Sequence, residues 1–179
     1  VMFVDLRGFS TFTETADPEE VMAVLREYHA TMGKLVMAHQ GTIEQFAADG
    51  IMIFFNDPIP LPNPAENAIR MALEMHTRFA HLRVNWNKRG YNLQMGIGIA
   101  QGYATIGAIG FEGRMDYGAI GVVVNLAARL CAEAKGEQTL IAQRVLARVE
   151  EMVKAEYVGD LTLKGFHRPV PAFNVVSIT

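Results

Sequence analysis

The stretch GTIEQFAADGIMIFFN, residues 41–56, constrains the fold more than any other part of the chain. An Asp-Gly pair between two strand-like runs is the strongest short-range signal for a β-hairpin. We therefore predict two antiparallel strands across Gln45–Phe55, joined at Asp49-Gly50. Such a hairpin excludes a receiver domain, which also places an Asp at a strand end but needs a sheet in which strands and helices alternate.

Further strands and two long helices surround this hairpin. Apolar runs predict strands at Val1–Leu6, Met95–Ile99 and Tyr103–Ile109. One helix begins at Asp17-Pro18-Glu19-Glu20 and ends before Gly41, and a second runs from Ala65 to about Lys88. The order β-α-β-β-α-β predicts an α+β fold, a ferredoxin-like sandwich with an antiparallel-rich sheet and the helices on one face.

The last third of the chain adds elements to this core. GFEGRMDYGAIG, residues 110–121, is interpreted as a glycine-containing loop, and VVVNLAARLCAEA, residues 122–134, as a third helix. Short strands are expected near Thr139–Ile141, Tyr157–Leu163 and Pro171–Val176, around a small helix near Arg144–Val149. We expect one domain across residues 1–179.

Composition limits the classes of partner. A formal net charge of −3 argues against a sequence-independent grip on nucleic acid. An RNA-binding ferredoxin-like sheet would need exposed aromatic side chains and a basic face, whereas the strands Met95–Ile99 and Ile51–Ile53 are aliphatic. The single cysteine, Cys131, excludes a disulfide framework and favours a reducing, cytoplasmic setting. We therefore expect no nucleic acid partner.

The start of the sequence suggests that the chain is part of a longer protein. No apolar run is long enough to span a bilayer, and no signal peptide is visible. The chain begins inside a predicted strand rather than at a Met. We expect a fragment of a longer protein with a fused regulatory domain, whose membrane attachment this sequence does not address.

Two acids stand where strands end. Asp5 ends the first strand, and Asp49 lies at the tip of the hairpin. In a ferredoxin-like sheet the first strand lies beside the middle hairpin, so the two carboxylates are expected to meet. Two unpaired carboxylates repel each other, and a divalent cation relieves that repulsion. Oxygen ligands without histidine or thiolate favour Mg²⁺ or Mn²⁺, and Mg²⁺ usually also binds substrate phosphates, which indicates a nucleotide.

Each acid also has a plainer interpretation. Asp5 could simply end the strand or cap a helix. Asp49 could be present because an Asp-Gly turn requires positive φ.

Three blocks of sequence together resemble the class III nucleotidyl cyclases, the adenylate and guanylate cyclase catalytic domains. They are FVDLRGFS, FAADGIMIFF and YGAIGVVVNLAARL, and the resemblance runs from Val1 to about Val176. It implies a homodimer that binds a nucleoside triphosphate in active sites shared between subunits. It also implies two Mg²⁺ or Mn²⁺ ions, attack of the ribose 3′-OH on the α-phosphate, loss of pyrophosphate and formation of a 3′,5′-cyclic nucleotide for signal transduction.

The resemblance implies roles for individual residues. Asp5 and Asp49 would hold the metals, with the backbone carbonyl of Leu6. Asn125 would orient the ribose and Arg129 would stabilise charge on the α-phosphate, both from the opposite subunit. Lys164 would bind the triphosphate.

The residues by themselves leave plainer alternatives for this second set. Asn125 and Arg129 are four apart and share a helix face, which is also how ordinary surface residues are spaced. The apolar flanks of Asn125 predict a buried amide with hydrogen-bond partners. Lys164 could be a surface lysine at a strand end. Arg7 and Arg114 are interpreted as surface or structural charges.

The positions that choose the purine depart from the family. Adenylate cyclases usually have Lys and then Asp or Thr, guanylate cyclases usually have Glu at the first position, and this chain has Gln45 and Gly118. Gln offers both a donor and an acceptor, and Gly offers no side chain. We expect an adenylate cyclase-type enzyme with ATP favoured and GTP left open, and the competing hypothesis is an inactive domain that binds nucleotide or dimerises as a regulatory module. Val122, where relatives often carry Asp or Asn, is a further departure.

Overall fold

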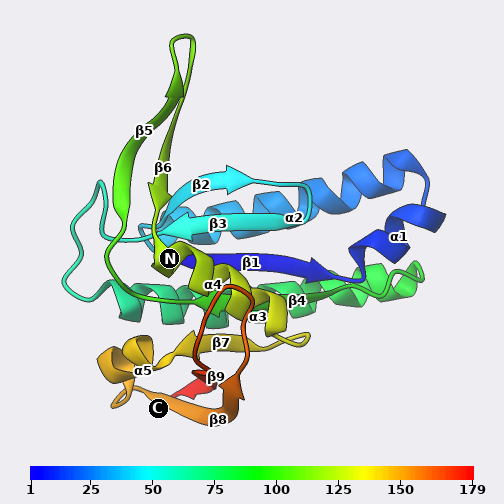
Figure 1. Ribbon diagram of the computed structural model, residues 1–179. Coiled ribbons are helices and arrows are strands. Elements are labelled where there is room, and N and C mark those ends of the chain that lie inside the picture. The colour runs from blue at the N-terminus through cyan, green and yellow to red at the C-terminus, as the bar shows by residue number, and fades with distance from the viewer.

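The computed structural model describes residues 1–179 as a seven-stranded sheet, a separate two-stranded hairpin and five helices (Figure 1). The elements in chain order are β1 (Met2–Arg7), α1 (Phe9–Thr15), α2 (Pro18–Ala38), β2 (Thr42–Phe46), β3 (Gly50–Phe54), α3 (Pro64–Lys88), β4 (Gln94–Ile99), β5 (Thr105–Phe111), β6 (Arg114–Ile120), α4 (Val122–Glu133), β7 (Thr139–Ala142), α5 (Gln143–Val149), β8 (Val153–Leu161) and β9 (Val170–Ile178). None of the helices combines the length and the apolar character that crossing a membrane requires.

The sheet has the strand order β2-β3-β1-β4-β7-β9-β8. β1 lies between β3 and β4 and runs antiparallel to both, and β4–β7 is the one parallel pair. The α+β class, the antiparallel-rich sheet and the position of the first strand beside the hairpin are therefore confirmed.

The large hydrophobic core lies on one face of the sheet, beneath α2 and α3. β1 contributes its alternate residues Met2, Val4 and Leu6 to this core, which contains 29 buried residues. The two helices form where the sequence predicts, because α2 has Pro18 and two acids in its first turn, and the Asn63 side chain accepts a hydrogen bond from the Glu66 N–H at the start of α3. This face of the sheet is closed to solvent, and its role is to pack the hydrophobic core.

α4 departs from the predicted arrangement with helices on one face, because it lies on the opposite face of the sheet (Figure 1). Gly96 and Gly98 of β4 alternate with residues of the large core and face α4. A Cβ atom on Gly98 would collide with the backbone of Ala127 and Cys131. The missing side chain lets the helix backbone rest directly on the strand.

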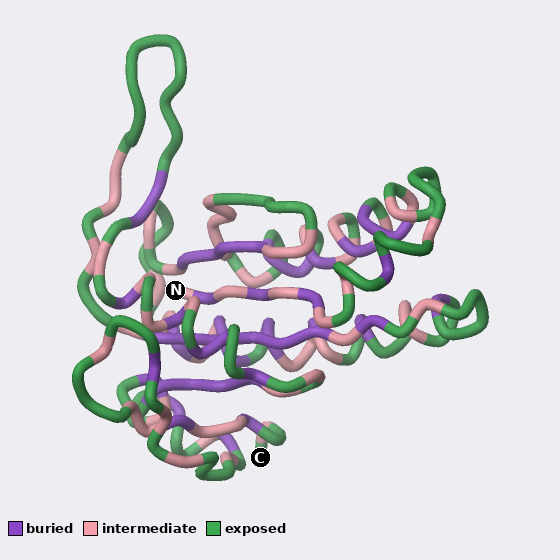
Figure 2. Tube along the Cα trace, turned by 45° about the vertical axis from the view of Figure 1, so that its right-hand side comes forward, coloured by how far each residue is buried: buried purple, intermediate pink, exposed green.

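The predicted loop over residues 110–121 is wrong, since most of it forms β6. β6 pairs with β5 in continuous register from Thr105↔Ile120 to Phe111↔Arg114. The glycines at 110, 113 and 118 hide the strand pattern. Two of them, Gly110 and Gly113, have positive φ near the tip of the hairpin. The hairpin projects away from the sheet, and its outer half is exposed (Figures 1 and 2).

Candidate active site

The fold brings Asp5 and Asp49 together at one end of β1. Asp5 is paired across the sheet with Gly50, the residue after Asp49. The Leu6 N–H donates a hydrogen bond to the carbonyl oxygen of Asp49 at 3.1 Å, and also to Asp5 Oδ1 at 3.0 Å. The predicted convergence of the two acids is therefore confirmed, and their role as metal ligands stays a prediction.

The turn that carries Asp49 does not require an Asp-Gly pair for its backbone geometry. Neither Asp49 nor Gly50 has positive φ. The turn is instead closed by the Ala47 N–H donating to the Gly50 carbonyl at 2.8 Å and by the buried Tyr28 hydroxyl donating to the Asp49 carbonyl at 3.2 Å. The turn-based explanation of Asp49 is therefore not supported by its conformation.

The Asp5 carboxyl group is electrostatically disfavoured when ionised. Burial first and the neighbouring Asp49 second raise the pKa of Asp5 to about 6, although Arg7 and the Leu6 N–H act in the opposite direction. An acid held in this state fits a divalent cation, which would offset both the repulsion and the desolvation. No cluster of three or more His, Cys, Asp or Glu side chains exists that would form a complete protein cage for a metal. The pair fits an ion that takes few protein carboxylates and completes its shell with substrate and water.

Arg7, interpreted from the sequence as a surface or structural charge, has a structural role whose partners the sequence did not reveal. Its Nη1 lies 3.4 Å from Asp5 Oδ2, its Nε donates to the Ala134 carbonyl at 3.0 Å, and its Nη2 donates to the Cys131 carbonyl. The guanidinium thus caps the C-terminal end of α4 and holds it beside Asp5. The available signal was the spacing, because Asp5 and Arg7 are two apart on a strand and share a face.

A pocket of about 300 Å³ opens beside the two acids, between the β2–β3 hairpin and α4. Asp5, Asp49 and Gln45 all line it, together with Ala128 and Cys131 of α4. Gln45 is exposed on β2, so its amide is free to rotate toward a ligand. Leu6 is buried, and only its backbone is available at the site.

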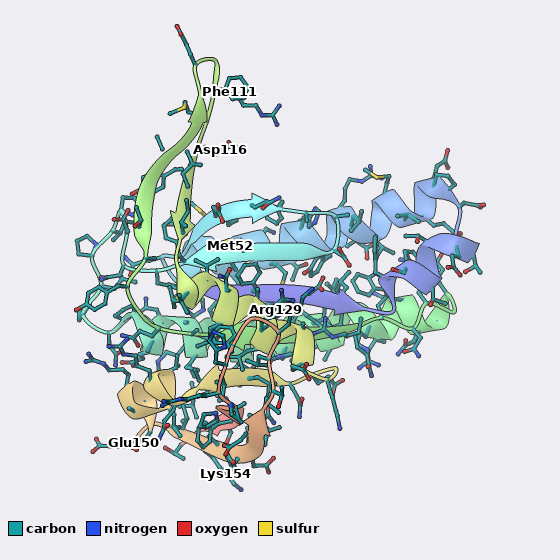
Figure 3. The ribbon with its side chains drawn as sticks, in the orientation of Figure 1. Met52, Phe111, Asp116, Arg129, Glu150 and Lys154 are labelled. Atoms are coloured by element: carbon teal, nitrogen blue, oxygen red, sulfur yellow. The ribbon has the colours of Figure 1, made fainter.

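Asn125, Arg129 and Lys164 form a second group on the outside of α4. Asn125 and Arg129 share one face of the helix, as predicted, and both side chains are exposed. Figure 3 shows Arg129 on α4, in front of the sheet. The prediction that Asn125 is buried is wrong, since its apolar neighbours in the sequence point to the other sides of the helix.

Lys164 is brought to the same helix by its neighbours in the chain. It is exposed in the segment between β8 and β9. Leu163 is buried against Leu130 of α4, and Phe166 packs on the same cluster. The structure therefore brings Lys164 beside the helix that carries Asn125 and Arg129, which sequence spacing does not reveal.

Gly118 lies in β6 opposite Gly107, and not in a loop. A Cβ atom at this position would stand 2.6 Å from Glu44 Oε1 and 3.2 Å from Ile109 Cδ1. The carboxylate of Glu44, a residue that the sequence analysis did not single out, thus occupies the space where a side chain at 118 would begin.

Comparison with known proteins shows the family of the chain. The model of the adenylate and guanylate cyclase catalytic domain matches residues 1–176. The chain belongs to this family. The cyclase domain is 34% identical to adenylate cyclase 1 of Rhizobium meliloti over 99% of its own length and 27% of the relative's. It is 32% identical to an adenylate cyclase of Anabaena cylindrica over 73% of its length and 26% of that protein.

Solved structures show the same fold. The adenylyl cyclase CyaB from P. aeruginosa superposes with a TM-score of 0.95 at 33% identity, over 98% of this chain and 92% of that one. The guanylyl cyclase Cya2 superposes with a TM-score of 0.90 at 32% identity, over 99% and 91%. Identity to an adenylyl and to a guanylyl cyclase is nearly equal, so likeness alone does not choose the base. The chain spans between about a quarter and a third of the length of the curated relatives it matches, from 27% to 32% of the first five.

Proposed function

We propose that this cyclase domain converts ATP to 3′,5′-cyclic AMP and pyrophosphate, using two Mg²⁺ or Mn²⁺ ions in active sites shared between two copies of the chain. The observation that carries the proposal is the convergence of Asp5 and Asp49 at the mouth of a pocket beside α4. The adenylate cyclases among its relatives support ATP, with GTP as the alternative substrate.

Asp5, Asp49 and the carbonyl of Leu6 would hold the metals. When bound, the two ions would supply positive charge for the attacking 3′ oxygen and for the triphosphate. Asp5 suits this role, because its ionised carboxylate lacks a sufficient counter-charge and a bound cation would supply one. Arg7 positions Asp5 by holding it against the end of α4.

The residues on α4 and the following segment would act on the rest of the substrate. Asn125 would orient the ribose so that its 3′ hydroxyl faces the α-phosphorus. The 3′ hydroxyl would lose its proton to water as the new O–P bond forms and the bond to pyrophosphate breaks. The fixed charge of Arg129 would stabilise the charge that builds on the α-phosphate oxygens. Lys164 would bind the departing pyrophosphate.

A second copy of the chain would complete the site. Asn125 and Arg129 are exposed on α4 and do not line the pocket that contains Asp5 and Asp49, so within one chain they form a separate group. The β5–β6 region and the start of α4 also expose large apolar side chains: Tyr103, Ile109, Phe111, Met115, Tyr117, Ile120 and Val122. An apolar surface of this kind marks a protein interface. A guanylyl cyclase domain with the same fold is described in one structure as a non-canonical dimer and in another as monomeric.

The test is product formation by the purified domain. ATP and GTP are each incubated with Mg²⁺ or with Mn²⁺, and cyclic nucleotides are identified by mass. Cyclic AMP as the main product supports the proposal, and cyclic GMP alone would reverse the choice of base. No cyclic product with either nucleotide would overturn the proposed reaction.

An inactive regulatory module is the second candidate, favoured by the missing side chain at Gly118 and by the exposed, uncharged Gln45. Such a domain would bind a nucleotide or dimerise without turnover. The greater length of the relatives is compatible with a fused regulatory domain in either case. Nucleotide binding without any cyclic product in the same experiment would favour this candidate.

A further inference from the structure

A bulge in β2 places an unassigned acid beside the residues expected to read the purine. The pairing of β2 with β3 shifts between Ile43 and Gln45, so Glu44 is an extra residue opposite no partner. A bulge redirects the side chains around it, and here Glu44 reaches β6. Its carboxylate stands against Gly118, while its neighbour Gln45 lines the pocket at Asp5 and Asp49.

Gly118 is what makes room for this carboxylate. A Cβ atom at 118 would lie 2.6 Å from Glu44 Oε1, closer than real Cβ contacts allow, and 3.3 Å from its carboxyl carbon, which is tighter than most. Any larger residue at 118 would therefore push Glu44 away. Because Gly118 of β6 has no side chain, the carboxylate of Glu44 from β2 can occupy the space beside it.

The Glu44 carboxylate has no partner in the chain. None of the ion pairs includes it, and it is partly buried. Burial and, after it, the negative charge of Asp116 raise the pKa of Glu44 above its ordinary value. Asp116 lies on the projecting β5–β6 hairpin, which also contains Gly118 (Figure 3). An acceptor held beside a second acid, with no donor facing it, is suited to a donor that a ligand brings.

We propose that Glu44 is a specificity-determining residue that accepts a hydrogen bond from the exocyclic amino group of adenine, in the space that Gly118 leaves. This inference rests on the proposed function. Gln45, beside it, would donate its amide N–H to the adjacent ring nitrogen. Guanine carries a carbonyl oxygen in place of the amino group, and that oxygen would face a carboxylate with no proton between them. The chain thus selects ATP with an acid from β2 instead of a side chain from β6.

The experiment compares kcat/KM for ATP and for GTP, with Mn²⁺, in the wild-type domain and in Glu44→Gln. The variant keeps the size of the side chain but removes its charge, and its amide can turn to donate to a carbonyl. We expect the ratio of kcat/KM for ATP over GTP to fall at least about tenfold. Asp116→Asn is the matched control, because it removes a neighbouring charge but keeps the Glu44 carboxylate, and it should leave the ratio within about twofold.

A second variant moves the carboxylate back to β6. In Glu44→Ala with Gly118→Asp, the side chain at 118 no longer meets Glu44, and its nearest remaining neighbour is the flexible end of Ile109. Glu44→Ala alone should lose the preference for ATP, and the double variant should regain most of it. This gain distinguishes base selection from a structural role, because a structural defect would not be repaired by a new acid on another strand.

Competition of ATP and GTP against a fluorescent nucleotide separates the two proposals. If the wild-type domain binds ATP in preference to GTP but forms no product, the proposed reaction fails, and the fall in binding preference in Glu44→Gln still supports the role of Glu44. Equal losses for both nucleotides, or an unchanged ratio, would overturn that role while leaving the cyclase reaction intact. A wild-type domain that binds neither nucleotide would overturn both.

Discussion

On one face of the sheet, β1 places Met2, Val4 and Leu6 in a core of 29 buried residues beneath α2 and α3. On the other face, the same strand places Asp5 and Arg7 beside α4, among three small clusters of 6, 3 and 3 buried residues. One strand thus belongs to both a closed apolar layer and a polar, partly open one. The alternation of side chains along a strand makes this possible.

The difference shows how the domain separates stability from chemistry. The large core is built from hydrophobic side chains, and its Tyr28 hydroxyl reaches the site by donating to the carbonyl oxygen of Asp49. The α4 face keeps two like charges together and raises the pKa of Asp5, which costs stability in the absence of a cation. A broad core on the opposite face of the same strands offsets that cost.

The strongest way to break this comparison is Asp49→Asn. If the α4 face is specialised for chemistry, the variant should lose at least about 10³-fold in kcat/KM with Mn²⁺, because several kcal/mol of metal-derived stabilisation disappear. Its Tm should stay within about 3 °C of the wild type, because Asp49 lies outside the large core. Cyclic nucleotide assays and thermal melts check both parts. Asp160→Asn, on the far strand β8, is the control and should keep full activity.

Mixing two inactive variants tests whether the site spans two copies. Asp5→Ala and Arg129→Ala should each be inactive alone, and an equal mixture should regain about a quarter of wild-type activity, since half of the dimers are mixed and each rebuilds one of two sites. The measurement is cyclic nucleotide formation after co-refolding or subunit exchange, with the mixed dimer quantified separately. Mixed dimers that form without any gain in activity would rule out a shared site.

Two packing variants sharpen the comparison between the faces. Met75→Ala empties part of the large core, where Met75 is 0% exposed, and should lower the free energy of unfolding by about 3 kcal/mol with kcat nearly unchanged. Gly98→Ala should cost about 2 kcal/mol and also lower kcat, because the new methyl group displaces α4 at Ala127 and Cys131.

Urea denaturation and kcat at saturating substrate measure these two effects. The comparison between faces fails if Met75→Ala lowers kcat as much as Gly98→Ala does.

The smallest expected effect concerns pH. The pKa of Asp5 is raised in the folded chain to about 6, so the folded state binds a proton that the unfolded state releases, and stability is lost as pH rises through that value. Asp5→Asn should therefore raise the Tm of the metal-free domain by about 2 °C at pH 8, after discounting for a partly exposed carboxyl, and by less at pH 5. The variant should also remove any stabilisation by Mn²⁺. A gain that is equal at both pH values would show that the charge of Asp5 is not its cause.

The sequence by itself determined the elements with strong periodic or local signals. The hairpin around Asp49, the helices that became α2 and α3, and α4 with Asn125 and Arg129 on one face all followed from spacing and end signals. The convergence of Asp5 and Asp49 also followed, because the order of elements already implied which strands are neighbours. Local patterns are enough when the information lies within a few residues of where it acts.

Other features were decided only by the tertiary structure. The side of the sheet that α4 covers depends on Gly98 of β4, some thirty residues before Cys131, and the burial of Asn125 was misjudged because its apolar neighbours lie on the other sides of the helix. Glycines hid the strand pattern of β6. Their role is visible only in the fold, where β6 pairs with β5 and Gly118 leaves space for a carboxylate from β2. The links from Arg7 to α4 and from Glu44 to Gly118 join segments more than 70 residues apart. No local pattern encodes such contacts, because they arise only when the sheet aligns the strands and the side chains share the remaining space.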